Sequence, residues 1–299
     1  MWRQLLEQIQ NGDTKALARS ISFVENGQEG YEEFLMHLPS NKHSKIIGIT
    51  GPPGAGKSTL VDGLIGELIN QKKKIAVFCV DPSSPFNMGA VLGDRIRMSQ
   101  WYTHPDVFIR SLATRGSMGG LHPKIIELTE LAKAANYDYI ILETVGVGQS
   151  EIEIAGLADT TAVVLVPESG DEIQTMKSGL MEIADVFVVN KTDRPDADAF
   201  VRNLRMMLAP AFSTHSNEVA IVKTIAHEHK GIKELMEAVE KHQQIAGANG
   251  KRYLLLAERA WKIIQEHRMK DITKEQLAKS IKEMGSSSFN LYQFVRQFY

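Results

Sequence analysis

The chain has 299 residues, of which 43% are hydrophobic and 23% are charged, a balance typical of a globular protein. Its net charge of −2 argues against nucleic acid as the main partner, because nucleic-acid binding generally requires a strongly basic surface. The single cysteine, Cys79, excludes an internal disulfide, and no apolar run is long enough to cross a membrane. We therefore expect a cytoplasmic protein whose partners include neither nucleic acid nor a membrane.

Residues 1–42 are predicted to form a helical N-terminal extension. Trp2, Leu5 and Ile9 recur at helical spacing, and Asp13 is placed to cap a second helix. We interpret the apolar faces of these helices as packing surfaces rather than as a ligand site.

Residues 43–244 alternate short apolar runs with helical stretches. This order predicts an α/β domain with a mostly parallel sheet flanked by helices. The expected strands cover residues 46–50, 75–80, 107–110, 139–143, 162–167, 185–190 and 219–223. Ligands of such sheets bind at the carboxyl ends of the strands, so the residues that follow each strand are the candidates for a functional site.

The first strand runs directly into a glycine-rich loop with the spacing of a phosphate-binding P-loop. Gly51, Gly56, Lys57 and Ser58 complete the pattern GxxxxGKS, and a helical repeat of apolar residues follows. Backbone N–H groups of such a loop surround phosphate, the lysine reaches the terminal phosphates and the serine hydroxyl ligates Mg²⁺. The predicted nucleotide contacts here are Gly51, Pro52, Pro53, Gly54, Ala55, Gly56, Lys57, Ser58 and Thr59.

Acidic residues follow two of the other predicted strands. Glu143 ends the strand 139–143, before a glycine-rich segment that contains Gln149, and it suits a carboxylate that holds Mg²⁺ directly or through water. Asp81 follows the strand 75–80. The candidate metal ligands are Ser58, Asp81, Asp94 and Glu143, and the candidate catalytic residues are Lys57, Glu143, Gln149 and Lys177, the last of which lies in a loop able to swing towards phosphate.

The strand 185–190 ends in the sequence NKTD, which in a P-loop protein indicates guanine recognition. The Asp193 carboxylate can accept hydrogen bonds from guanine N1–H and N2–H₂, which adenine does not offer. Asn190 can bond the base edge, and the stem of Lys191 can cover the base. A last base contact is expected from the segment Ile225, Ala226 and His227, with the Ala226 N–H facing guanine O6.

Residues 245–299 are predicted to form a helical C-terminal extension. Trp261, Leu291, Phe294 and Phe298 give its helices apolar faces that must be covered. The cover is either the extension's own domain or another subunit, and we favour a second copy of the chain, which predicts a homodimer.

These motifs together resemble those of the MeaB/ArgK-like P-loop GTPases, which are chaperones of adenosylcobalamin-dependent acyl-CoA mutases. The matching segments are GPPGAGKST (51–59), VDPSSP (80–85), GDRIRM (93–98), ATRGSMGGL (113–121), ILETVGVGQSE (141–151), ESGDEIQTMKSG (168–179) and NKTD (190–193). The order of these segments is that of the family, and the helical extensions at both ends match its layout.

The resemblance implies a function and a set of roles. The protein would bind GTP and GDP with Mg²⁺, hydrolyse GTP, and gate cofactor loading by a mutase of the methylmalonyl-CoA mutase type. Lys57, Ser58, Asp81, Asp94 and Glu143 would surround Mg²⁺ and phosphate, and Lys177 would belong to a switch that couples mutase binding to hydrolysis. The C-terminal helices would form the homodimer, and a cobalamin adenosyltransferase is a second candidate partner.

Two other functions stay open at this point. A P-loop kinase of a basic amino-acid transport system would share the phosphate loop, but such kinases seldom carry NKxD and the sequence shows no acceptor site. A nickel-delivery GTPase would need clustered histidines or cysteines, whereas only His227 and His229 form a close pair.

Overall fold

The computed structural model describes nine segments of the chain. They are residues 2–39, 43–81, 98–114, 121–144, 150–169, 183–212, 219–245, 250–284 and 289–298. The chain forms two compact units, Met1–Arg252 and Tyr253–Tyr299. The first unit contains the N-terminal helices together with the sheet, and the second contains most of α12 and the helices that follow it.

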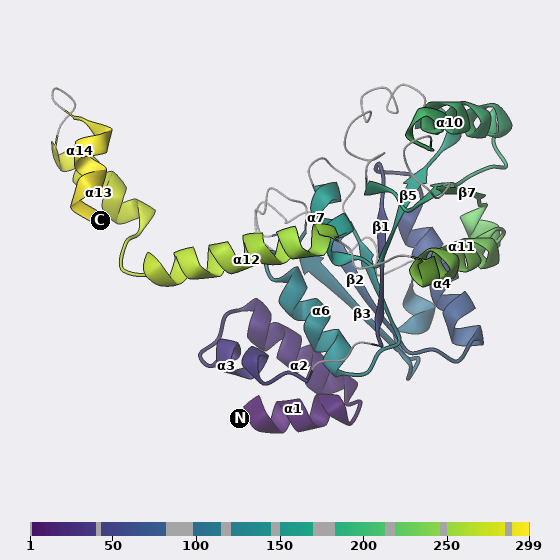
Figure 1. The fold of residues 1–299 in the computed structure, drawn as a ribbon. Coiled ribbons are helices and arrows are strands. Elements are labelled where there is room, and N and C mark those ends of the chain that lie inside the picture. The colour runs from purple at the N-terminus through teal and green to yellow at the C-terminus, as the bar shows by residue number, and fades with distance from the viewer. Residues whose placement is uncertain are drawn as a thin grey trace. The chain divides into compact units, whose positions relative to one another are not determined.

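A seven-stranded sheet, parallel throughout, is the centre of the first unit (Figure 1). Its strands are β1 (Lys45–Thr50), β2 (Ile75–Asp81), β3 (Val107–Ala113), β4 (Tyr139–Glu143), β5 (Thr160–Leu165), β6 (Val186–Val189) and β7 (Ala220–Lys223). Their order across the sheet is β3-β2-β4-β1-β5-β6-β7, so β1, which carries the glycine-rich loop, lies in the middle. The predicted α/β fold with a mostly parallel sheet is confirmed.

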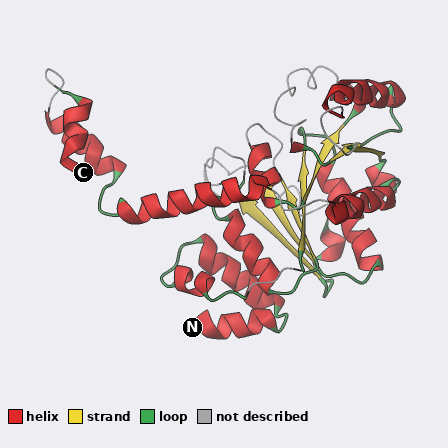
Figure 2. Ribbon diagram, viewed as in Figure 1, coloured by secondary structure: helices red, strands yellow, loops and turns green. Residues whose placement is uncertain are grey.

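Helices cover both faces of this sheet (Figure 2). The helices of the first unit are α1 (Trp2–Gln10), α2 (Thr14–Glu25), α3 (Tyr31–Met36), α4 (Lys57–Asn70), α6 (Ile125–Ala134), α7 (Ser150–Leu157), α10 (Ala197–Phe212) and α11 (Ile232–Ile245). The second unit contains most of α12 (Gly250–Arg268), together with α13 (Lys274–Met284) and α14 (Leu291–Val295). One core joins α4 and α11 to the sheet, and a second joins α10 to β5 and β6. Because both of its faces are buried, the inner strands β1, β2, β4, β5 and β6 are mostly apolar rather than alternating.

One predicted strand is displaced. The sequence indicated residues 162–167, whereas β5 is Thr160–Leu165. Pro167 has no N–H group to donate to a neighbouring strand, and it begins a short 3₁₀ helix, η2 (Pro167–Ser169). The β-branched pair Thr160 and Thr161 joins the strand instead, and both side chains are buried.

The helix ends follow local capping rules. The Asp13 side chain accepts hydrogen bonds from the N–H groups of Lys15 and Ala16 at 2.8 and 3.0 Å, as its position predicted. In the second unit, Thr273 and Gln276 bond each other's backbone N–H groups at 3.1 and 2.9 Å and so begin α13. Within the described part of the chain, no helix combines the length and apolar character that a bilayer span requires.

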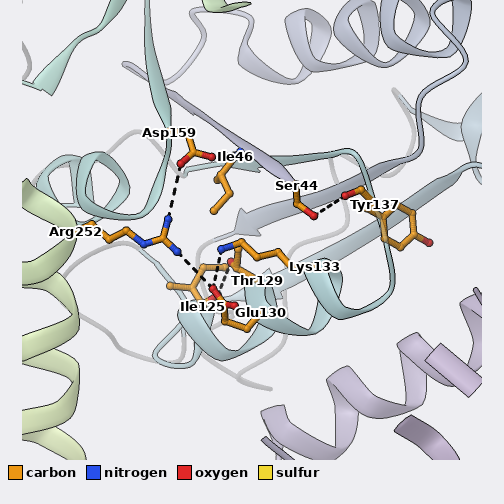
Figure 3. A network of polar contacts seen from close by, with 9 residues as sticks. All are labelled: Ser44, Ile46, Ile125, Thr129, Glu130, Lys133, Tyr137, Asp159 and Arg252. Atoms are coloured by element: carbon orange, nitrogen blue, oxygen red, sulfur yellow. Dashed lines mark hydrogen bonds and ion pairs between the residues drawn. The ribbon is translucent and has the colours of Figure 1, made fainter. Parts of the chain in front are cut away.

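A polar network holds the start of β1 in place (Figure 3). The Asp159 carboxylate accepts from the Ile46 N–H at 2.8 Å and lies 3.8 Å from the Arg252 guanidinium. Arg252 also lies 3.6 Å from Glu130, which pairs with Lys133 at 2.8 Å. The network therefore joins α6, the turn after α7 and the first residues of α12 to the strand that leads into the glycine-rich loop.

Candidate functional site

The loop between β1 and α4 has a backbone that requires glycine. Gly51, Gly54 and Gly56 have φ angles of 138°, 77° and 90°. A Cβ atom on Gly51 would lie 2.1 Å from the Val164 carbonyl oxygen, and one on Gly56 would lie 2.4 Å from Asn190 Nδ2. The glycines therefore let the loop pass close to β5 and to the end of β6, and they place it at the N-terminus of α4, where the helix dipole favours an anion.

Lys57 brings a positive charge to the same loop. Its side chain is buried, and Nζ donates to the carbonyl oxygens of Gly51 and Pro52 at 2.9 and 3.1 Å. The ammonium group contacts two carbonyls of the loop, so its positive charge adds to the partial positive charge at the N-terminus of α4. This combination suits the phosphates of a nucleotide.

Ser58 and Glu143 lie together beneath the loop. Ser58 Oγ donates to Glu143 Oε1 at 2.7 Å, and the two residues are 5% and 3% exposed. Glu143 ends β4, between Ile49 of β1 and Cys79 of β2. Hard cations such as Mg²⁺ prefer oxygen ligands, so this hydroxyl and carboxylate pair fits the predicted metal. Asp81 ends β2 at the same edge of the sheet.

Asn190 joins the phosphate loop to the predicted base-binding segments. Its side chain is 2% exposed, and Nδ2 donates to the Ala55 carbonyl at 2.9 Å. Its Oδ1 accepts from Thr224 Oγ1 at 3.1 Å and from the Ala226 N–H at 3.0 Å. One amide group thus holds three segments in fixed relation: the loop after β1, the end of β6 and the end of β7.

The contact of the Ala226 N–H with guanine O6 stays a prediction. In this structure that N–H donates to Asn190 Oδ1. The reason is that a buried amide oxygen must be paired, and the Ala226 N–H lies within reach of it. The amide nitrogen of Asn190 has two N–H donors, and one of them bonds the Ala55 carbonyl. The predicted hydrogen bond from Asn190 to the base edge would therefore use the other N–H.

The other residues of the base-binding prediction lie near the loop surface. Lys191 has a φ of 59° and donates through Nζ to the Gly54 carbonyl at 2.7 Å, so its stem lies against the loop. Asp193 and His227 are exposed. Ile225 is half-buried, and its N–H donates to the Lys230 carbonyl at 3.1 Å. Among the described residues of this segment, Asp193 and His227 are therefore accessible from solvent.

Comparison with known proteins identifies the family of the chain. The family model described as methylmalonyl Co-A mutase-associated GTPase MeaB matches residues 17–284. The chain belongs to the MeaB family. A protein of Pyrococcus abyssi that is named a putative GTPase is 45% identical over 267 residues, covering 88% of this chain and 81% of that protein.

Two further proteins are similar to this MeaB-family chain. The mitochondrial methylmalonic aciduria type A homolog of Caenorhabditis elegans is 38% identical over 207 residues, which cover 64% of this chain and 52% of that protein. The crystal structure of a LAO/AO transport system kinase matches with a TM-score of 0.68 at 25% identity, covering 99% of this chain and 96% of that one. The first of these proteins is similar to this chain in sequence, and the second is similar in fold.

The structure brings together only part of the predicted site of this MeaB-family protein. Lys57, Ser58, Glu143 and Asn190 are adjacent to the glycine-rich loop. Asp94, Gln149 and Lys177 lie outside the described residues, and of Asp81 only the backbone is described.

Two pairs at this edge of the sheet were not predicted. Thr144 Oγ1 donates to Thr50 Oγ1 at 2.9 Å, which ties the end of β4 to the end of β1. Arg194, directly after the NKTD segment, pairs with Glu168 after β5. The hydrogen bond from Arg194 holds the pKa of the Glu168 carboxyl below its usual range. The threonines were detectable as polar residues at the ends of apolar strands, whereas nothing in the sequence paired Arg194 with Glu168.

Proposed function

We propose that this protein binds GTP with Mg²⁺, hydrolyses it to GDP and phosphate, and serves as a chaperone of an adenosylcobalamin-dependent acyl-CoA mutase. The observation that carries the proposal is the Asn190 side chain, which joins the phosphate loop to the segments after β6 and β7. The segment that binds the triphosphate and the NKTD segment that binds the guanine base would then be held in one fixed arrangement. Membership of the MeaB family supports both the nucleotide and the mutase.

Each residue of the phosphate site has a role in this proposal. The loop N–H groups and the N-terminus of α4 would bind the phosphate oxygens, and Lys57 would exchange its carbonyl contacts for the terminal phosphates. Ser58 and Glu143 would hold Mg²⁺, which neutralises charge on the phosphates when bound. Asp81, Asp94, Gln149 and Lys177 remain proposed participants.

Asp193 is proposed to select guanine. We expect Asp193→Asn to lower affinity for GTP and raise affinity for xanthosine triphosphate, since the amide presents a donor where guanine also donates. Because Asp193 is exposed, part of the mismatch is solvated, and the preference should change by about tenfold. Titration of both nucleotides into the wild type and the variant measures this. Binding of ATP by the wild type as tightly as GTP would contradict guanine selection.

The mutase partner is supported by names within the family. The matching family is described as mutase-associated, and the Caenorhabditis elegans relative is named for methylmalonic aciduria. We expect a cognate methylmalonyl-CoA mutase to raise GTP turnover. We also expect it to bind about tenfold more tightly in one nucleotide state than in another, within the usual range of coupling between two sites. A cobalamin adenosyltransferase is a further proposed partner.

This expectation is tested by phosphate release with and without the mutase. A Ser58→Ala variant, which removes a proposed Mg²⁺ ligand, should show neither the basal nor the stimulated rate. A panel of adenosylcobalamin-dependent mutases identifies the client. If none of them changes the rate, and none binds more tightly in one nucleotide state than in another, the chaperone role is wrong.

A kinase is the second candidate, because the crystal structure at TM-score 0.68 is that of a transport system kinase. The product separates the two functions: a GTPase transfers the γ-phosphoryl group to water, and a kinase transfers it to a protein or a metabolite. A nickel-delivery role has less support. Among the described residues, no three His, Cys, Asp or Glu side chains are grouped so as to hold a metal ion.

A homodimer is also part of the proposal. Of the four apolar residues that the prediction named, Trp261, Leu291 and Phe298 are 67%, 54% and 43% exposed, whereas Phe294 is buried within the second unit. Exposed apolar side chains of this size are typical of a surface that a partner covers. We expect the full-length protein to sediment as a dimer at micromolar concentration, and Trp261→Glu to favour the monomer because it places a charge on this surface. Sedimentation of the wild type as a monomer would refute the dimer.

A further inference from the structure

A pocket separate from the glycine-rich loop lies between the N-terminal helices and the edge of the sheet. It has a volume of about 590 Å³, within the range of small-molecule sites. Its lining comes from α1, α2, the turn after α2 and β3, and consists of Gln4, Leu5, Gln8, Ala18, Arg19, Ser22, Phe23, Gln28 and Arg110. We call this the α1–α2 pocket. None of these residues belongs to the candidate nucleotide site.

Arg110 occupies a position where an apolar residue would be expected. It lies in the interior of β3, opposite Phe78 of β2. Alternation along the strand places it on the same face as Phe108 and Leu112, both of which are buried. The Arg110 side chain is 29% exposed. A charged residue on an otherwise apolar strand face breaks the local pattern, and such exceptions are concentrated at functional sites.

The contacts of Arg110 hold its guanidinium in one orientation. Its terminal nitrogen donates to Ser22 Oγ at 3.2 Å and to Glu25 Oε2 at 3.0 Å, both on α2. Its Nε is buried and has no hydrogen-bond partner among the described residues. Glu25 is not part of the pocket lining, so its carboxylate steadies the arginine from one side. A guanidinium held in this way is prepared to bind an oxyanion in the pocket.

Arg19 adds a second guanidinium to the same lining. Its terminal nitrogen donates to Gln8 Oε1 at 3.0 Å, which is a neutral acceptor, and no carboxylate of the described residues pairs with it. None of the nine lining residues is acidic. Of the two arginines in this wall, Arg110 pairs with the Glu25 carboxylate, whereas Arg19 has no carboxylate partner among the described residues, so the α1–α2 pocket favours negative charge.

We propose that the α1–α2 pocket binds a small organic anion. Arg19 and Arg110 hold its carboxylate or phosphate group, since the planar guanidinium bonds both kinds of oxyanion through paired N–H donors. Gln4, Gln8 and Gln28 bond further polar groups, and Leu5 and Phe23 contact the apolar part of the molecule. The packing interpretation of α1 and α2 still holds for their buried faces, and the pocket is an additional use of their polar residues.

Calorimetric titration of the full-length protein tests this proposal. Succinate serves as the carboxylate probe and glycerol 3-phosphate as the phosphate probe, each at millimolar concentrations, with sodium chloride as the ionic control. We expect at least one probe to bind with a stoichiometry of one per chain, and the stronger probe identifies the anionic group. The Lys57→Ala variant should bind it equally well, because the glycine-rich loop takes no part. If neither probe binds, the proposal is wrong.

Two variants and one matched control locate the binding. Arg19→Gln and Arg110→Gln should each weaken binding by about tenfold or more, the loss expected for one charge-assisted hydrogen bond. Arg3→Gln is the control, since Arg3 lies on α1 but stacks on the Trp2 ring and does not line the pocket. Arg19 is exposed, so its variant reports on binding even if Arg110→Gln does not fold. Unchanged binding by Arg19→Gln, or an equal loss in Arg3→Gln, would overturn the proposal.

Discussion

Replacement of Asn190 by alanine is expected to lower the free energy of unfolding by about 3 to 5 kcal/mol. The amide makes three buried hydrogen bonds, and its removal leaves the Ala55 carbonyl and the Ala226 N–H without their partner. An unsatisfied buried backbone group costs about 1 to 3 kcal/mol. The loss would be a large part of the 5 to 15 kcal/mol that roughly describes the stability of a folded domain.

The same substitution should weaken nucleotide binding beyond its effect on stability. The three segments that Asn190 joins would no longer hold one geometry, so a nucleotide that contacts all of them would have to order them on binding. Denaturant unfolding and GTP titration measure the two effects. Asn203→Ala is the matched control, because Asn203 is exposed on α10 and its loss should change stability by less than about 0.5 kcal/mol.

A second variant distinguishes the contribution of the Asn190 amide oxygen from that of the amide nitrogen. Asn190→Asp keeps an oxygen that can accept from Thr224 and Ala226, but it places a carboxylate against the Ala55 carbonyl. We expect this variant to be destabilised as well, chiefly through the phosphate loop. If Asn190→Ala were as stable as the wild type, the linking role of this side chain would have to be abandoned, and with it the main structural support for the proposed function.

Lys57→Ala is expected to remove tight GTP binding while leaving the fold intact. The variant loses a charge-assisted contact with phosphate, worth about 1.5 to 3 kcal/mol, which corresponds to a loss of affinity of roughly 10- to 150-fold. In the structure the ammonium also bonds the carbonyls of Gly51 and Pro52, so the loop itself should become less ordered. Titration with a fluorescent GTP analogue measures the affinity.

Lys233→Ala provides the control for this change. Lys233 is exposed on α11, away from the glycine-rich loop, so its removal should leave GTP affinity unaltered. Thermal unfolding establishes that both variants are folded. A Lys57→Ala protein that bound GTP within about threefold of the wild type, less than the loss of one such contact, would rule out the glycine-rich loop as a phosphate site.

Local chemistry made much of this protein predictable from its sequence. The apolar runs indicated all seven strands because a sheet buried on both faces demands them. The glycine positions indicated the loop between β1 and α4, because only glycine avoids the clash of a Cβ atom with Val164. Asp13 indicated the start of a helix, since a cap depends only on residues within one turn.

Contacts between distant segments required the tertiary structure. Asn190 and Ala55 are 135 residues apart, Ser58 and Glu143 are 85 apart, and no local pattern encodes which of them meet. The order of strands across the sheet decides those meetings, by placing β1 between β4 and β5. Arg110 lies on an edge strand beneath α1 and α2 for the same reason. Residue types and spacing thus determined which groups carry the chemistry, and the folding of the sheet decided which of those groups share a site.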